Sequence, residues 1–189
     1  DTIIDTTMNT HIKIAFGYKA RSGKDTAREY LEKRYRVHTI RFAGALYDIM
    51  NYAQKRVGIT QHKDSAMMQL VGQGFRDRYG PGVWVNAALS DYVRALESDL
   101  GKPQCDRIEI AAVADMRYRQ EADTLRAMGF YLVKIDRPNR PIDRDPNHSS
   151  EIDLDGYDFD ETVENTGTIE EFETKIQQLV DRLRAVQKK

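Results

Sequence analysis

The chain has 189 residues, of which 40% are hydrophobic and 31% are charged, and its formal net charge is −1. This composition is typical of one α/β domain with its own core, and it argues against bulk binding to nucleic acid or to an anionic membrane. Cys105 is the single cysteine, which excludes an internal disulfide and a cysteine-based zinc site.

The periodicity of apolar residues predicts strands and helices that alternate along the chain. Strands are expected at residues 11–16, 37–42, 108–114, 131–135 and 162–165. Helices are expected at 24–31, 46–57, 64–76, 83–100 and 117–128, and from 168 onward, where Thr168 and Glu171 suit a capping box. This order predicts an α/β fold, a three-layer domain with a parallel five-stranded sheet and helices on both faces.

A turn rich in glycine and lysine, residues 17–26, follows the first strand and opens the first helix. Phosphate-binding P-loops occur in this context, because consecutive N–H groups and the helix N-terminus attract a phosphate. Lys24 is expected to reach the β- and γ-phosphates of ATP; the alternative is a tight turn with a solvated lysine. The ATP-binding residues predicted in the turn are Lys19, Ala20, Arg21, Ser22, Gly23, Lys24, Asp25 and Thr26.

Two positions depart from the standard P-loop motif. Tyr18 stands where the first glycine is usual, with Gly17 one position early, and Asp25 stands where a serine or threonine is usual. That hydroxyl ordinarily coordinates Mg²⁺, and a carboxylate also serves a hard cation. We therefore expect Mg²⁺ as cofactor, with Asp25 acting directly or through a metal-bound water.

The segment Arg21-Ser-Gly-Lys-Asp-Thr26 resembles the P-loop of phage-type deoxynucleoside monophosphate kinases. Later segments resemble the same family in order: residues 70–76 with 81–86, 114–117 with 121–122, 148–151, and 164–168. The resemblance spans about residues 11–180. It implies a single P-loop kinase domain over residues 8–189, with an acceptor-binding insertion near 43–100 and a lid near 137–151. Residues 1–7 are interpreted as a leader or a cloning remnant.

The resemblance implies phosphoryl transfer from ATP to a deoxynucleoside 5′-monophosphate, with Mg²⁺ bridging the β- and γ-phosphates. A P-loop kinase for another phosphate acceptor, such as phosphomevalonate, is one alternative, because animal-type phosphomevalonate kinases share related motifs. A non-catalytic nucleotide-binding module is another. We expect no nucleic-acid or membrane partner and a cytoplasmic location, which for a viral protein means the host cytoplasm. Monomer and homodimer both stay open.

Asp115 and Arg117 follow the most apolar predicted strand, at the edge of the sheet where open α/β folds bind ligands. Asp115 is expected to hold the Mg²⁺ shell or to orient the acceptor, and Arg117 to grip an acceptor phosphate. The alternatives are a polar strand end and an exposed arginine. On one helix face, Gln69, Gln73 and Arg76 suit the acceptor base and phosphate, or only a solvated surface.

Six further candidates come from the later segments. Trp84 is either a core residue or a stacking partner for the acceptor base, and it is kept among the acceptor-binding residues. Residues 136–150 are expected to form a loop rich in arginine. In it, Arg140 and Arg144 are expected to act on the transferred phosphoryl group and Arg137 to bind ATP; the alternative is a surface loop whose arginines are neutralised by the aspartates among them. Adenine contacts at Asn165 and Gly167 are implied by the resemblance, whereas helix-entry geometry is the alternative.

Overall fold

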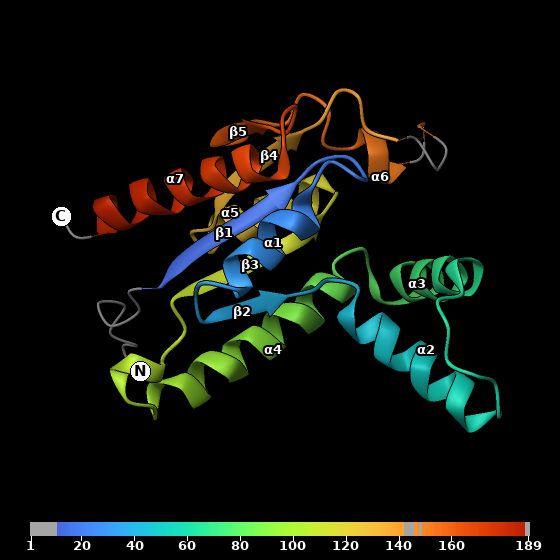
Figure 1. Cartoon of the computed structure of the whole chain (residues 1–189). Coiled ribbons are helices and arrows are strands. Elements are labelled where there is room, and N and C mark those ends of the chain that lie inside the picture. Colours follow the sequence, from blue (N-terminus) through green and yellow to red (C-terminus); the bar gives the residue numbers. More distant parts are fainter. Residues whose placement is uncertain (1–10, 142–145, 148, 188–189) are drawn as a thin grey trace.

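Strands and helices alternate along the chain in the predicted order (Figure 1). The computed structural model describes residues 11–141, 146–147 and 149–187. The strands are β1 (Ile12–Gly17), β2 (Val37–Ile40), β3 (Ile110–Met116), β4 (Tyr131–Asp136) and β5 (Glu161–Glu164). The helices are α1 (Lys24–Glu32), α2 (Gly44–Arg56), α3 (Ser65–Tyr79), α4 (Val83–Leu100), the 3₁₀ turn η2 (Gln104–Asp106), α5 (Arg119–Ala127), α6 (Ser149–Ile152) and α7 (Ile169–Gln187).

The five strands form one sheet in the order β2-β3-β1-β4-β5, and every pairing is parallel. The predicted parallel five-stranded sheet is therefore confirmed. Because all strands run the same way, their carboxyl ends lie along one edge. β1 is the central strand of the sheet, so the P-loop that follows it opens at the middle of this edge.

Helices cover both faces of the sheet, as the alternating pattern predicted. α1 and α7 pack on one face and α4 and α5 on the other (Figure 1). The alternation of side chains along each strand explains the two cores, because successive residues of β1 and β3 point to opposite faces. In β1, for example, Ile14 belongs to the first core and Ala15 to the second.

The helices between β2 and β3 divide into two parts. α4 lies along the sheet, whereas α2 and α3 form a smaller cluster with the start of α4 (Figure 1). Leu46, Met50 and Trp84 are the buried residues of this cluster. We expected an insertion over residues 43–100. Of this segment, only α2, α3 and the first turns of α4 project beside the sheet edge.

Most element boundaries differ slightly from the expectation, and the differences around Asp115 and in the lid bear on the site. β3 continues to Met116, so Asp115 belongs to the strand, and α5 begins at Arg119 because Glu121 caps the backbone N–H groups of Arg117 and Tyr118. The lid expected near residues 137–151 includes the start of helix α6, where Glu151 accepts a hydrogen bond from the Ala20 N–H of the P-loop. Among the described residues, no helix has the length and apolar character that crossing a membrane requires.

Candidate active site

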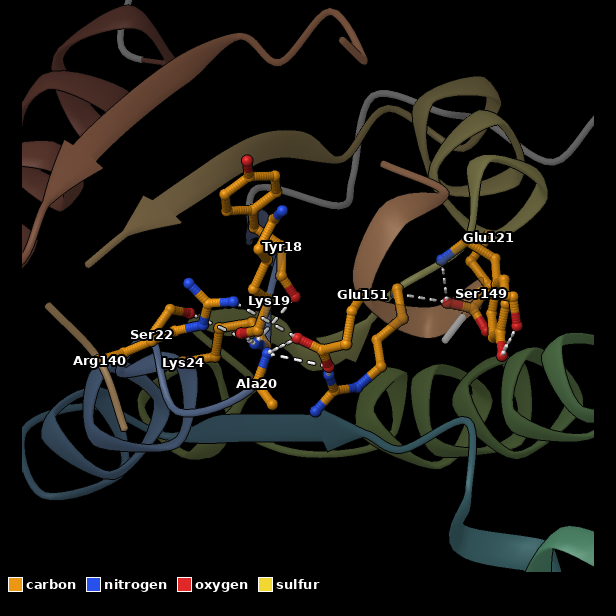
Figure 2. Close-up of polar contacts among 11 residues, drawn as sticks. Tyr18, Lys19, Ala20, Ser22, Lys24, Glu121, Arg140, Ser149 and Glu151 are labelled. Atoms are coloured by element: carbon orange, nitrogen blue, oxygen red, sulfur yellow. Dashed lines mark hydrogen bonds and ion pairs between the residues drawn. The ribbon is translucent and has the colours of Figure 1, made fainter. Parts of the chain in front are cut away.

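The P-loop turn holds the side chain of Lys24 inside it. The ammonium donates to the carbonyl oxygens of Tyr18, at 3.0 Å, and Lys19, and lies 3.3 Å from Oγ of Ser22 (Figure 2). Lys24 is 4% exposed although it opens helix α1. This position directs a buried positive charge toward the concave side of the turn, where a phosphate would meet the helix N-terminus.

Tyr18 explains why a glycine is usual at its position. Its φ angle is 99°, in the left-handed region that residues with a Cβ rarely adopt. The ring is held by the Lys134 ammonium, 4.2 Å from its centroid, and by an edge contact with Phe159. Gly17 has a different role, because a Cβ there would lie 2.4 Å from Cε of Met116.

Two residues of the loop before α7 have structural roles. Asn165 donates from Nδ2 to the Ser22 carbonyl at 2.9 Å, which ties this loop to the P-loop. A Cβ at Gly167 would lie 1.9 Å from Oε2 of Glu171, the oxygen that accepts the Thr168 N–H in the predicted capping box. Helix-entry geometry thus accounts for Gly167, and adenine contacts by these residues stay a prediction.

A cavity of about 240 Å³ opens between the P-loop and the start of the lid, and we name it the phosphate cavity. It brings Lys24 together with two arginines from distant segments, Arg117 after β3 and Arg137 after β4. Converging cations in front of a P-loop suit a polyphosphate. The lining residues are Arg21, Gly23, Lys24, Asp25, Arg117, Arg137 and Pro141.

A larger cavity of about 670 Å³, the α2 cavity, adjoins the phosphate cavity. The two share Asp25 and Arg117, so these side chains separate one space from the other. The α2 cavity carries cationic, aromatic and amide groups, which suit a phosphorylated ring compound. Its lining residues are Asp25, Arg28, Thr39, Ile40, Arg41, Ala43, Gly44, Tyr47, Asp48, Asn51, Ala114, Asp115 and Arg117.

Two of the three carboxylates that line the α2 cavity, Asp25 and Asp115, suit a hard cation. Asp115 accepts a hydrogen bond from the Ala43 N–H at Oδ2 (3.2 Å), while its buried Oδ1 has no hydrogen-bond partner in the described part of the chain. Burial raises the pKa of Asp115, and the amides of Ala43 and Phe42 and the charge of Arg117 oppose this. The described residues contain no cluster of three or more metal-ligating side chains, so phosphate oxygens and water would complete a Mg²⁺ shell.

A third cavity of about 370 Å³, the α3 cavity, lies beside Tyr118 and the second half of α3. Gln73 and Arg76, which we expected on one face of this helix, both line the α3 cavity. The central carbon of the Arg76 guanidinium lies 5.6 Å from the centroid of the Tyr118 ring. Gln69 is exposed and lines none of these three cavities. The predicted stripe therefore contributes Gln73 and Arg76 to one cavity and leaves Gln69 outside it.

Glu121 is a buried carboxylate at the wall of the α3 cavity. Its Oε2 accepts the backbone N–H groups of Arg117, at 2.7 Å, and Tyr118, at 3.1 Å. Burial raises the pKa of Glu121 to about 7, which these hydrogen bonds and Arg76 only partly offset. Glu121 thus determines the backbone path from which Arg117 projects.

Lid residues meet the P-loop through Glu151 of α6. Its carboxylate accepts the Ala20 N–H at 3.0 Å and pairs with Arg117 at 3.0 Å and Arg140 at 3.8 Å (Figure 2). Through Glu151, Arg140 lies near the P-loop, and its expected action on the transferred phosphoryl group stays a prediction. Arg144 lies outside the described residues.

The prediction of Trp84 as a base-stacking residue is wrong. The indole is 5% exposed and packs beside Phe75, with ring centroids 5.1 Å apart. Its Nε1 donates to the Gly72 carbonyl at 3.1 Å, and this bond satisfies the polar atom of an otherwise apolar side chain. Trp84 joins α3 to α4 in the core and is among the lining residues of none of the three cavities.

Several site residues were absent from the prediction. Both Glu151 and Glu121 lie in segments with recognisable motifs. The contacts of Glu151 come from residues distant in the chain, whereas Glu121 accepts from Arg117 and Tyr118 just before it, so a capping box at the start of α5 was a usable local signal. Arg41 follows β2 directly, so its place at the carboxyl edge of the sheet was a usable signal. The other additions are on α2: Tyr47, Asp48 and Asn51.

Known proteins resemble this chain in sequence and in fold. A 41% identical segment covers 36% of the chain and 35% of a protein of Acanthamoeba polyphaga mimivirus named "Putative deoxynucleotide monophosphate kinase". The "Uncharacterized protein ORF76" of Ictalurid herpesvirus 1 (strain Auburn) is 28% identical over 85% of the chain and 63% of its own length. The chain thus spans less than two thirds of either relative.

The unliganded crystal structure of a sugar kinase from Janibacter sp. HTCC2649 superposes with a TM-score of 0.50, at 15% identity, over 94% of this chain and 98% of its own. This likeness supports the P-loop kinase-like fold. The deoxynucleotide monophosphate kinase family matches residues 66–176, which is more than half of the chain. This match, which includes Asp115, Arg117 and Glu151, shows that the chain belongs to the deoxynucleotide monophosphate kinase family.

Proposed function

We propose that this chain transfers the γ-phosphoryl group of ATP to a deoxynucleoside 5′-monophosphate, giving ADP and the diphosphate. One observation carries the proposal: Asp25 and Arg117 line both the phosphate cavity and the α2 cavity. Two adjoining spaces that share the Arg117 guanidinium suit two anions that must meet in line, and the shared Asp25 carboxylate suits a cation between them. The family and the fold support a nucleotide kinase, and the acceptor and ATP are our inference.

In the proposed complex, the β- and γ-phosphates of ATP occupy the phosphate cavity. Lys24 and the P-loop amides hold them from one side, and Arg137 from the other. The acceptor lies in the α2 cavity with its phosphate toward Arg117 and Arg41. Its phosphate oxygens are already ionised near neutral pH, so the reaction requires no general base.

The protein's contribution is then positioning and charge neutralisation. Arg117 touches both spaces, so its guanidinium is suited to the charge that spreads over the phosphoryl group during transfer. Asp25 and Asp115 would hold Mg²⁺, which supplies further charge neutralisation at the phosphates when bound. Arg140 would close over the phosphoryl group from the lid and exclude water.

The decisive experiment is a panel of acceptors. Each deoxynucleoside and ribonucleoside monophosphate, and phosphomevalonate, is incubated with ATP and Mg²⁺ and ADP release is measured. We expect turnover with at least one deoxynucleoside monophosphate. Turnover with phosphomevalonate alone would identify a non-nucleotide kinase, and ATP-analogue binding without any turnover would indicate a nucleotide-binding module.

A further inference from the structure

One carboxylate joins three separate parts of the candidate active site. Glu151, on the short helix α6, contacts Ala20 of the P-loop, Arg117 after β3 and Arg140 of the lid (Figure 2). Its side chain is 2% exposed, so water screens these contacts poorly. A buried carboxylate is retained at low cost only where it is paired and hydrogen-bonded, as it is here.

Both carboxylate oxygens take part in these contacts. Oε1 accepts from Nη1 of Arg117 at 3.0 Å, and Oε2 lies 3.8 Å from Nη2 of Arg140, while the Ala20 N–H is shared between Oε2, at 3.0 Å, and Oε1, at 3.3 Å. Only one guanidinium nitrogen of Arg117 is used in this contact, which leaves other N–H groups of the fork for a ligand. Arg117 lines the phosphate cavity and the α2 cavity while it makes this contact.

The geometry points to Glu151 as a positioning residue that holds Arg117 and Arg140 in the orientation for phosphoryl transfer. This inference rests on the proposed function. Glu151 acts through the arginines and touches no substrate. Its bond to Ala20 fixes α6 against the P-loop, so the arginines and the phosphate-binding turn keep one relative arrangement.

If the carboxylate of Glu151 served only to neutralise charge, its removal would change kcat in the opposite direction. If Glu151 only neutralised the arginines, its removal would make the site more positive and would favour anionic substrates. The positioning role instead predicts slower transfer, because replacing the carboxylate with an amide removes the negative charge and one of the two acceptor oxygens that hold the guanidinium groups. The direction of the change in kcat therefore separates the two roles.

The test uses Glu151→Gln and Glu151→Asp, with kcat measured at saturating ATP and acceptor and ATP-analogue affinity measured by calorimetry. Glu151→Gln should lower kcat by roughly 30-fold or more without weakening analogue binding, a split that marks an effect on the transition state. Glu151→Asp keeps the charge and should recover part of the rate. An unchanged or higher kcat in Glu151→Gln would overturn the inference.

A double-mutant cycle tests whether Glu151 acts through the arginines. Adding Glu151→Gln to the Arg117→Ala, Arg140→Ala double variant should change kcat by less than about twofold, because the groups to be positioned are gone. Full additivity would contradict the proposal. Glu109→Gln is the matched control, since Glu109 also pairs with two arginines, Arg36 and Arg184, away from the site. It should alter stability and leave kcat unchanged.

A further readout is independent of the acceptor. With an ATP analogue bound, Arg117 and Arg140 should be protected from phenylglyoxal in the parent, and at least one should lose protection in Glu151→Gln. Arg94, which is 71% exposed, is the internal control and should react equally in both. Absence of turnover in the parent would sink the proposed function, while equal protection in both proteins would sink the positioning role.

Discussion

Asn165 Nδ2 donates a 2.9 Å hydrogen bond to the carbonyl oxygen of Ser22, and so joins the loop before α7 to the P-loop across 143 residues of sequence. The same nitrogen would lie 2.4 Å from a Cβ at Gly23. The amide of Asn165 therefore occupies the space that a side chain would need at position 23. Through this contact the carboxyl-terminal part of the chain supports the phosphate-binding turn.

Asn165→Ala should weaken nucleotide binding because the turn loses this support. A lost hydrogen bond of this kind costs about 1 kcal/mol, which corresponds to roughly fivefold in affinity. Asn165→Asp should be worse, since a carboxylate would face the Ser22 carbonyl. Calorimetry with an ATP analogue measures the effect, and Asn86→Ala on the exposed face of α4 is the control. Unchanged affinity in both Asn165 variants would show that the turn needs no such support.

Lys24→Ala should abolish turnover and leave the fold intact. The buried ammonium lies within the P-loop turn, where it can reach a bound polyphosphate, and a clamp of this kind is worth ~3–4 kcal/mol in the transition state. We expect kcat to fall by roughly 100-fold or more, with a normal circular dichroism spectrum. Lys33→Ala, at the other end of α1, should behave like the parent. Near-normal kcat in Lys24→Ala would refute the active-site assignment.

The fold was predictable because its signals are local and strong. Short apolar runs that suit buried strands, amphipathic helices and the capping box of Thr168 and Glu171 each depend on residues close in sequence. The P-loop was predictable for the same reason, since one short segment supplies both the turn and Lys24. The carboxyl-edge rule for parallel sheets then placed Asp115 and Arg117 near it.

The rest of the site depends on contacts that no sequence spacing encodes. Glu151 meets Arg117 across 34 residues and Ala20 across 131, and a single glutamate in a polar loop carries no local sign of either contact. The prediction for Trp84 was wrong for a different reason, which is that its residue type suits two environments. For a tryptophan beside a predicted site, burial in the core is the commoner fate and stacking on a base the rarer one, and only the packing of α3 against α4 decides between them.

Asp25 should couple the metal to the nucleotide. Asp25→Ser restores the more usual P-loop residue, so we expect partial activity with a shifted Mg²⁺ dependence, whereas Asp25→Ala should lose more. A Mg²⁺ titration of kcat at fixed ATP measures this. Glu29→Ser is the control, because Glu29 pairs with Arg28 on the same helix and lines none of the three cavities. Identical Mg²⁺ curves for the parent and both Asp25 variants would exclude a metal role.

Arg41 and Arg76 distinguish the two cavities beside Arg117. If the acceptor occupies the α2 cavity, Arg41→Ala should cost about 1.5–3 kcal/mol, or roughly 10- to 150-fold in kcat/KM for the acceptor. Arg76→Ala should cost less, and neither should change ATP-analogue affinity. Arg94→Ala is the control. A larger loss in Arg76→Ala than in Arg41→Ala would move the acceptor into the α3 cavity.

Glu121 should make stability depend on pH between its unfolded and folded pKa values. Burial raises the pKa of this carboxyl from 4.5 to about 7, against the opposing effect of the Arg117 and Tyr118 amides and the Arg76 charge, and Asp115 adds to the rise. Between these values the folded state binds more protons than the unfolded state, so the free energy of unfolding falls as pH rises. The contribution of this one group amounts to about 3 kcal/mol at most.

Glu121→Gln removes that titration and keeps an oxygen that can accept the Arg117 and Tyr118 N–H groups. Urea unfolding at pH 5, 6, 7 and 8 should show the variant gaining on the parent as pH rises, with the change complete about one unit above pH 7. The difference between the two proteins cancels the titration of the other groups that they share. A constant difference across this range would mean that Glu121 is ionised throughout, and that Arg76 and the two amides compensate for its burial.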